Sequence, residues 1–180
     1  MKKLLLLLLV SLSAAHAFAA RAPLAREEYV TRIESCEAII QEFMLRPDTA
    51  IPAEILAQAR AIVITNQFKA GFILGVKDGY GIVMVKKPNG RWSVPVFLNA
   101  GEASIGFQIG ATTVETVYVI TDDETPRRLY GQRFNVGADV RAIAGPRIAE
   151  RDAQNRAIIA APVLVYTKSN GIYAGATIKA

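Results

Sequence analysis

Residues 81–99 read GIVMVKKPNGRWSVPVFLN, and this stretch decides the fold. Two runs rich in β-branched and aromatic residues, Gly81–Lys87 and Arg91–Asn99, flank the sequence Lys87-Pro88-Asn89-Gly90. Because an Asn-Gly pair tolerates the positive φ of a tight turn, the stretch predicts a β-hairpin. Neighbouring strands joined by such a turn pair antiparallel, so we expect an antiparallel sheet.

More strands are predicted on both sides of this hairpin. Runs of the same composition, bounded by Gly or Pro, occur at Ala61–Thr65, Gly71–Lys77, Ala103–Ile120, Arg133–Arg141, Pro162–Lys168 and Ile172–Lys179. The pairs Asp78-Gly79 and Asn170-Gly171 are interpreted as the turns of two further hairpins.

Helices are predicted mainly before the sheet. Apolar residues recur every three or four positions over residues 26–46, and Pro47 ends this amphipathic pattern. A second helix is expected over residues 51–60, and a short helix or polar loop over residues 121–130. Because helices precede strands without βαβ alternation, we expect an α+β fold, with N-terminal helices packed on a curled, barrel-like antiparallel β-sheet.

The N-terminus has the features of a secretory signal peptide. Two lysines precede an apolar run from Leu4 to Leu12, and small residues with candidate cleavage sites near Ala17 or Ala19 follow. The run is about half of the roughly 20 residues that span a bilayer. We therefore expect residues 1–19 to be removed on export, leaving a single domain over residues 20–180 that is periplasmic or secreted. An uncleaved anchor is the alternative.

The composition excludes several kinds of catalytic and metal site. The chain has 180 residues, one His and one Cys, and removal of the leader would remove His16. A mature chain without histidine has no Ser-His-Asp or Cys-His nucleophile system and no HExxH zinc site. Cys36 lies in the helical pattern and is interpreted as a core residue. We therefore expect no enzyme, no cofactor and no metal, although Asp139 with Glu150 remains a conceivable acid–base pair.

The charge is unevenly distributed along the chain. Residues 60–91 carry six Lys and Arg against one Asp, for a net charge of +5, whereas residues 92–126 carry five acids and no base. A basic stretch on hairpins can hold anionic head groups while the rings of Phe68, Phe72 and Tyr80 enter the interface. A solvated basic sheet face is the alternative, and export makes nucleic acid a poor partner.

Four short strings, in this order, carry a family resemblance. They are Lys69-Ala70-Gly71-Phe72 with Gly75, Trp92-Ser93-Val94-Pro95, Ser104–Gly110, and Ala161–Tyr166 followed by Gly171–Gly175. Together they resemble the SYLF domain family, from about Arg26 to the C-terminus. The resemblance implies a non-enzymatic, membrane-lipid-binding module that occurs in bacterial exported proteins. It also implies structural roles for the matched glycines and for Trp92, as a ring that fills the sheet interior.

From this resemblance and the basic stretch we expect peripheral binding to anionic phospholipid or another amphiphile. The candidate lipid-binding residues are Arg60, Lys69, Phe72, Lys77, Lys86, Lys87, Arg91 and Lys168. The alternative is a structural or scaffold protein of the periplasm that binds another protein through its sheet.

Overall fold

The computed structural model describes residues 23–129, 142–145 and 161–179, and for residues 71–77, 102–110, 142–144 and 171–179 it describes the backbone alone. The chain divides into two compact units, residues 1–30 and 31–180, and the sheet lies in the second. In chain order the elements are α2 (Arg26–Leu45), α3 (Ala53–Gln58), β1 (Ala61–Val85), β2 (Val96–Asn99), β3 (Glu102–Ile120), α4 (Thr125–Leu129), β4 (Ala142–Ala144) and β5 (Val163–Lys179).

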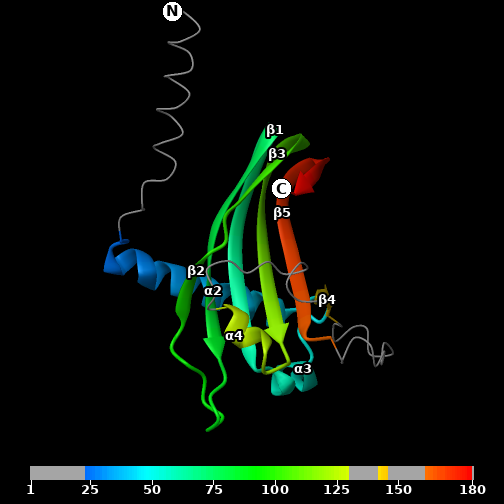
Figure 1. Cartoon of the computed structure of the whole chain (residues 1–180). Helices are drawn as coiled ribbons and strands as arrows, with labels where there is room; N and C mark the ends of the chain where they lie inside the picture. Colours follow the sequence, from blue (N-terminus) through cyan, green and yellow to red (C-terminus); the bar gives the residue numbers. More distant parts are fainter. Residues whose placement is uncertain (1–22, 130–141, 146–160, 180) are drawn as a thin grey trace, which may run out of the picture. The chain divides into compact units, whose positions relative to one another are not determined.

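The five strands form one sheet in the order β2-β1-β3-β5-β4 (Figure 1). Neighbouring strands pair antiparallel except for β4, which runs parallel to β5. The predicted α+β class is confirmed. Within the described residues β2 and β4 are edge strands, so the sheet is not closed and the barrel-like part of the prediction is not confirmed.

Strand β1 turns back on itself, so that its two ends lie side by side. The Lys86 N–H donates to the Arg60 carbonyl oxygen at 2.8 Å, just beyond the two ends of the strand. Further along, a Cβ atom added at Gly81 would lie 2.5 Å from the Ile64 carbonyl oxygen. Residues 61–77 of β1 pair with β3, and residues 80–83, near the end of the returning half, pair with β2.

This arrangement confirms one of the predicted turns and contradicts two. The Asn89-Gly90 turn is present, and Gly90 has a φ of +78°. Asp78-Gly79 lies inside β1 and Asn170-Gly171 inside β5, so the hairpins expected there are wrong. The ladder explains the difference, because Asn170 pairs with Thr113 and Gly171 with Thr112 on β3. Pairing with a long neighbour outweighs a local turn preference.

Other predicted strands changed accordingly. Two predicted strands, Ala61–Thr65 and Gly71–Lys77, and residues 81–85 of a third, Gly81–Lys87, are parts of β1. Residues 163–168 of the predicted strand Pro162–Lys168 merge with Ile172–Lys179 into β5. The strand predicted over residues 133–141 lies outside the described residues.

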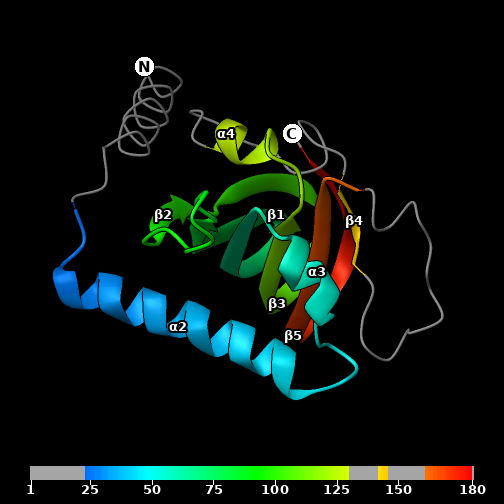
Figure 2. The ribbon, with the colours of Figure 1, turned by 90° about the horizontal axis from the view of Figure 1, so that it is seen from below.

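Hydrophobic clusters lie on both faces of the sheet because β-strand side chains alternate between faces. One face contributes Ile62, Ile64, Ile82, Val117, Val119, Leu164 and Tyr166 to a cluster that also contains Cys36, Ile39 and Phe43 of α2. The opposite face contributes Ala61, Val63, Val83, Ile120 and Val163, against which Leu129 of α4 packs. Figure 2 shows the C-terminal part of α2 and α4 on opposite sides of the strands.

Polar groups cap the helix ends. At the C-terminus of α2, the Thr49 hydroxyl donates to the Phe43 carbonyl oxygen at 2.9 Å, which satisfies one of the last helical carbonyls. At the start of α4, Asp122 Oδ2 accepts from the backbone N–H of Thr125 at 2.8 Å, as an N-cap does. Among the described residues, none of the helices combines the length and the hydropathy needed to span a bilayer.

The doubling of β1 predicts a large effect at Gly81. Replacing Gly81 with Ala places a methyl group against the Ile64 backbone, which cannot move without disturbing the ladder. We expect Gly81→Ala to lower the free energy of unfolding by about 2–3 kcal/mol, measured by urea denaturation.

The matched control is Gly90→Ala. A Cβ atom there has no neighbour within 4 Å, and only the positive φ opposes it. We expect that control to cost about 1 kcal/mol. Equal losses in the two variants would contradict the close approach within β1.

Cys36 is fully buried in the cluster between α2 and the sheet. Burial raises the pKa of its thiol to about 11, so the reactive thiolate is scarce. At pH 8 the thiolate fraction in the native protein is then about a hundredfold lower than for a thiol of pKa 9. We expect a disulfide reagent to label the native chain at least that much more slowly than the chain in denaturant. Rapid native labelling would show that the sheet does not cover the thiol of Cys36 on α2.

Candidate functional site

The turn between β1 and β2 is fixed by its own residues. The Lys87 N–H donates to the Arg91 carbonyl oxygen at 2.8 Å, and the Gly90 N–H donates to the Lys87 carbonyl oxygen at 2.9 Å. The Asn89 side chain accepts from the Arg91 N–H at 3.1 Å. These bonds hold Lys87 and Arg91 together at the two ends of one tight turn, where both are exposed.

The chain after the turn is anchored to the end of β1. The Ser93 N–H donates to the Val85 carbonyl oxygen at 2.9 Å, and the Ser93 hydroxyl accepts from the Val85 N–H at 3.1 Å. Lys86 forms a bridge with Trp92. We call residues 86–96, from Lys86 to Val96, the basic hairpin. Its two arms are joined by backbone bonds, and the backbone bond from Lys86 to Arg60 ties it to the start of β1.

Four of the predicted lipid-binding residues meet at this end of the sheet. They are Arg60, Lys86, Lys87 and Arg91. Arg60 pairs with Asp123 at 3.3 Å, and both side chains are more than half exposed. Within the described parts of the chain, neither Lys87 nor Arg91 has an acidic side chain at ion-pair distance. The result is a local excess of positive charge that the protein does not neutralise.

The basic hairpin also exposes large apolar side chains. Trp92 is 38% exposed, Val94 76% and Val96 40%. They alternate with Ser93 and Pro95, which are partly buried. The expectation that the Trp92 ring fills the sheet interior is wrong. Its ring lies beside Lys86, whose Nζ is 6.0 Å from the ring centroid.

Two of the other predicted residues lie elsewhere, and two are described only by their backbone. Lys168 projects from β5 and pairs with Glu42 of α2 and, at 3.6 Å, with Glu115 of β3. The hydrogen bond to Glu42 raises the pKa of Lys168. The positive charge of Lys168 is therefore already paired with carboxylates of this chain. Lys69 lies in β1 opposite Thr112, away from the turn. The side chains of Phe72 and Lys77 lie outside the described part of the chain.

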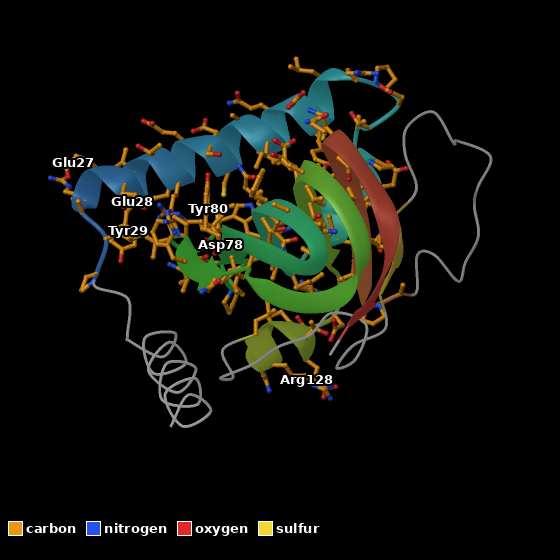
Figure 3. The ribbon with its side chains drawn as sticks, turned by 90° about the horizontal axis from the view of Figure 1, so that it is seen from above. Glu27, Glu28, Tyr29, Asp78, Tyr80 and Arg128 are labelled. Carbon is orange, nitrogen blue, oxygen red and sulfur yellow. The ribbon has the colours of Figure 1, made fainter. Side chains whose placement is uncertain are left out.

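The rings predicted to enter a membrane interface also separate. Tyr80 points toward α2 (Figure 3). Its hydroxyl donates to Ser35 Oγ at 3.0 Å, and the Arg32 guanidinium lies 4.7 Å from its ring centroid. Phe68 is half exposed, but it lies in the first half of β1, which pairs with β3. The basic hairpin therefore supplies Trp92 in place of the predicted Phe68, Phe72 and Tyr80.

The acidic residues just before α4 each have a partner of their own. Asp122 caps α4, Asp123 pairs with Arg60, and Glu124 pairs with Arg128 at 2.6 Å. These three carboxylates therefore have separate partners within the chain. Asp139 and Glu150 lie outside the described residues.

The sequence reasoning missed Val94 and Val96 as surface residues. The signal was present, because apolar residues alternate with Ser93 and Pro95 directly after the Asn-Gly turn. The sequence pattern predicts only a strand over Arg91–Asn99 and does not say which side chains of it are exposed. In the structure Val96 is the first residue of β2, whereas Val94 lies before the strand. The arm that contains Val94 projects beyond the sheet.

Comparison with known proteins matches the C-terminal part of the chain to a family. Residues 101–180 match the model of the Ysc84 family, described as Las17-binding protein actin regulator. No solved structure is significantly similar to the chain.

Related proteins align over about three quarters of the chain. The human SH3 domain-containing YSC84-like protein 1 is 29% identical over 134 residues, 74% of this chain and 39% of its own length. The Xenopus laevis protein of the same name is 31% identical over 136 residues, 74% of this chain and 40% of its own. LAS seventeen-binding protein 3 of Saccharomyces cerevisiae is 29% identical over 136 residues, 73% of this chain and 29% of its own.

The chain thus spans about two fifths or less of each of these relatives. The family description refers to Las17 binding and to actin regulation, and the name of the yeast relative refers to binding. The similarity to the SYLF family that the sequence motifs predict is confirmed, and residues 101–180 are the Ysc84 (SYLF) match in this chain.

Proposed function

We propose that this chain is a non-enzymatic lipid-binding protein of the cell envelope, which contacts anionic head groups through the basic hairpin. The observation that carries the proposal is the pair Lys87 and Arg91, exposed at one turn and without acidic partners among the described residues. Exposed cations that the protein leaves unneutralised are available to an anionic surface. The adjoining Trp92 is a side chain suited to a membrane–water interface.

The electrostatic contribution is of useful size. A Lys or Arg near an anionic membrane surface contributes about 1 kcal/mol. Lys87 and Arg91 contribute fully, whereas Arg60 is already shared with Asp123 and Lys86 also donates to the Ala57 carbonyl oxygen. A total of about 2–4 kcal/mol gives weak, reversible and salt-sensitive attachment.

The location is proposed from the leader. Residues 1–19 carry the sequence features of a secretory signal, so the mature chain would meet phosphatidylglycerol or cardiolipin in a bacterial envelope. These anionic phospholipids are therefore the head groups we propose. Ser93 carries the hydroxyl group of the basic hairpin. Its oxygen accepts from the Val85 N–H and its O–H donates to the Val94 carbonyl oxygen, so this hydroxyl serves the structure of the hairpin, in keeping with a binding role.

A protein partner is the second candidate. It is favoured by the name of the yeast relative, LAS seventeen-binding protein 3, and by the family description. Among the described strands β2 lies at an edge of the sheet, and an edge strand can pair with an added strand of a partner.

Flotation with vesicles tests the lipid proposal. The chain from residue 20 is mixed with phosphatidylcholine vesicles, or with vesicles that also contain phosphatidylglycerol, at low and at high salt. We expect it to float with the anionic vesicles at low salt and to be released as salt screens the charges. Lys87→Glu and Arg91→Glu should each weaken binding roughly tenfold or more, because each reversal removes one attraction and adds one repulsion.

Arg46→Glu is the matched control. It changes the net charge by the same amount, but Arg46 lies after α2 and already pairs with Asp48 at 2.7 Å. We expect it to bind almost as the parent chain does. Equal losses in all three variants would show a response to net charge and not to the basic hairpin. A chain that stays unbound in every vesicle experiment would reject the lipid proposal and leave the protein partner.

A further inference from the structure

The basic hairpin has an apolar component that attraction between charges does not explain. Trp92, Val94 and Val96 are all exposed within five residues of chain, next to Lys87 and Arg91. We infer that these three side chains enter the head-group and upper acyl region of an anionic bilayer, so that the basic hairpin is an insertion wedge. This inference rests on the proposed function and names how the same site holds the membrane.

The exposed apolar surface needs a physical reason. A Val side chain gains about 1.5 kcal/mol when it leaves water for an apolar environment. Val94 is 76% exposed, although it follows a serine whose backbone and hydroxyl are both bonded to the end of β1. The arm is therefore held in a position that keeps this side chain in water. A bilayer would remove that cost.

The basic side chains beside Trp92 indicate which kind of apolar environment the exposed side chains would enter. Lys86 lies beside the Trp92 ring, and Lys87 and Arg91 flank the turn. Long basic side chains place their stems against hydrocarbon and their charged ends among phosphates. A tryptophan ring prefers that same boundary because it is apolar with one polar N–H. An anionic lipid surface offers both environments at the right depth, which commits the inference to lipid.

The position and the rigidity of the basic hairpin suit insertion. Figure 1 shows the connection between β1 and β2 extending beyond the end of the sheet. The turn is closed by bonds from Lys87 to Arg91 and from Gly90 to Lys87. Because the turn is ordered before it meets a membrane, little conformational entropy remains to be lost on binding.

Tryptophan fluorescence tests the inference directly, because Trp92 is the single tryptophan of the chain. The chain from residue 20 is titrated with phosphatidylglycerol vesicles, with and without bromine on the upper acyl carbons. We expect the emission to shift to shorter wavelength as vesicles bind. Brominated lipid should quench it, because quenching requires the ring to lie close to the acyl chains.

Matched substitutions separate apolar insertion from charge. Val94→Ser keeps the net charge and should weaken binding roughly fivefold, since it removes most of the apolar surface of that side chain. Leu45→Ser is the control, because Leu45 is 79% exposed at the end of α2, outside the basic hairpin. It should leave binding unchanged. Thermal melting of both variants verifies that each remains folded.

The outcomes separate this inference from the function on which it rests. If the chain floats with anionic vesicles but Trp92 emission neither shifts nor is quenched, insertion is rejected and head-group binding stands. Equal binding of Val94→Ser and the parent chain would also reject insertion. If the chain does not float at all, the proposed function itself fails, and the exposed apolar residues then point to a protein partner.

Discussion

The close approach of the two halves of β1 is the constraint on which the rest of the structure depends. It requires that no side chain stand between the returning strand and the carbonyl oxygens of Ile64 and Asn66, and glycine at positions 79 and 81 meets that requirement. The end of the returning half can then pair with β2 through residues 80–83, while residues 61–77 pair with β3. Both hydrophobic clusters draw residues from both halves, so this contact also determines how the sheet is covered.

The sequence predicted those elements whose causes are local. The turn at Asn89-Gly90 depends on its own residues, and the helix from Arg26 depends on a spacing that can be read directly. Asp78-Gly79 and Asn170-Gly171 have the same local chemistry but form no hairpin turns. Gly79 packs against Asn66 and Gln67 on the other arm of β1, and Asn170 and Gly171 pair with β3, contacts that turn propensities do not include.

The sequence predicts that a basic segment exists, but not which of its side chains lie together in the candidate site. Counting charges identified a basic segment, and four of its cations lie at one end of the sheet. Lys168 was expected to contact head groups with them. It instead pairs with Glu42 of α2 and Glu115 of β3, and the sequence alone does not show that these three residues lie close together in the folded chain. Trp92 was expected inside the sheet because the family resemblance implies a structural role for it. Its exposure follows from where the arm leaves the sheet, which is a property of the folded chain.

The turn of the basic hairpin has a consequence for how this protein can change over time. Residues 88–90 belong to neither hydrophobic cluster, and the bonds that close the turn come from within it. Substitutions at residues 88–90 therefore do not disturb the packing of the hydrophobic clusters, provided that the turn can still form. The surface can acquire a different preference through a few replacements, while the sheet that presents it stays the same. Substitutions that change what the surface binds can therefore accumulate without changing the fold.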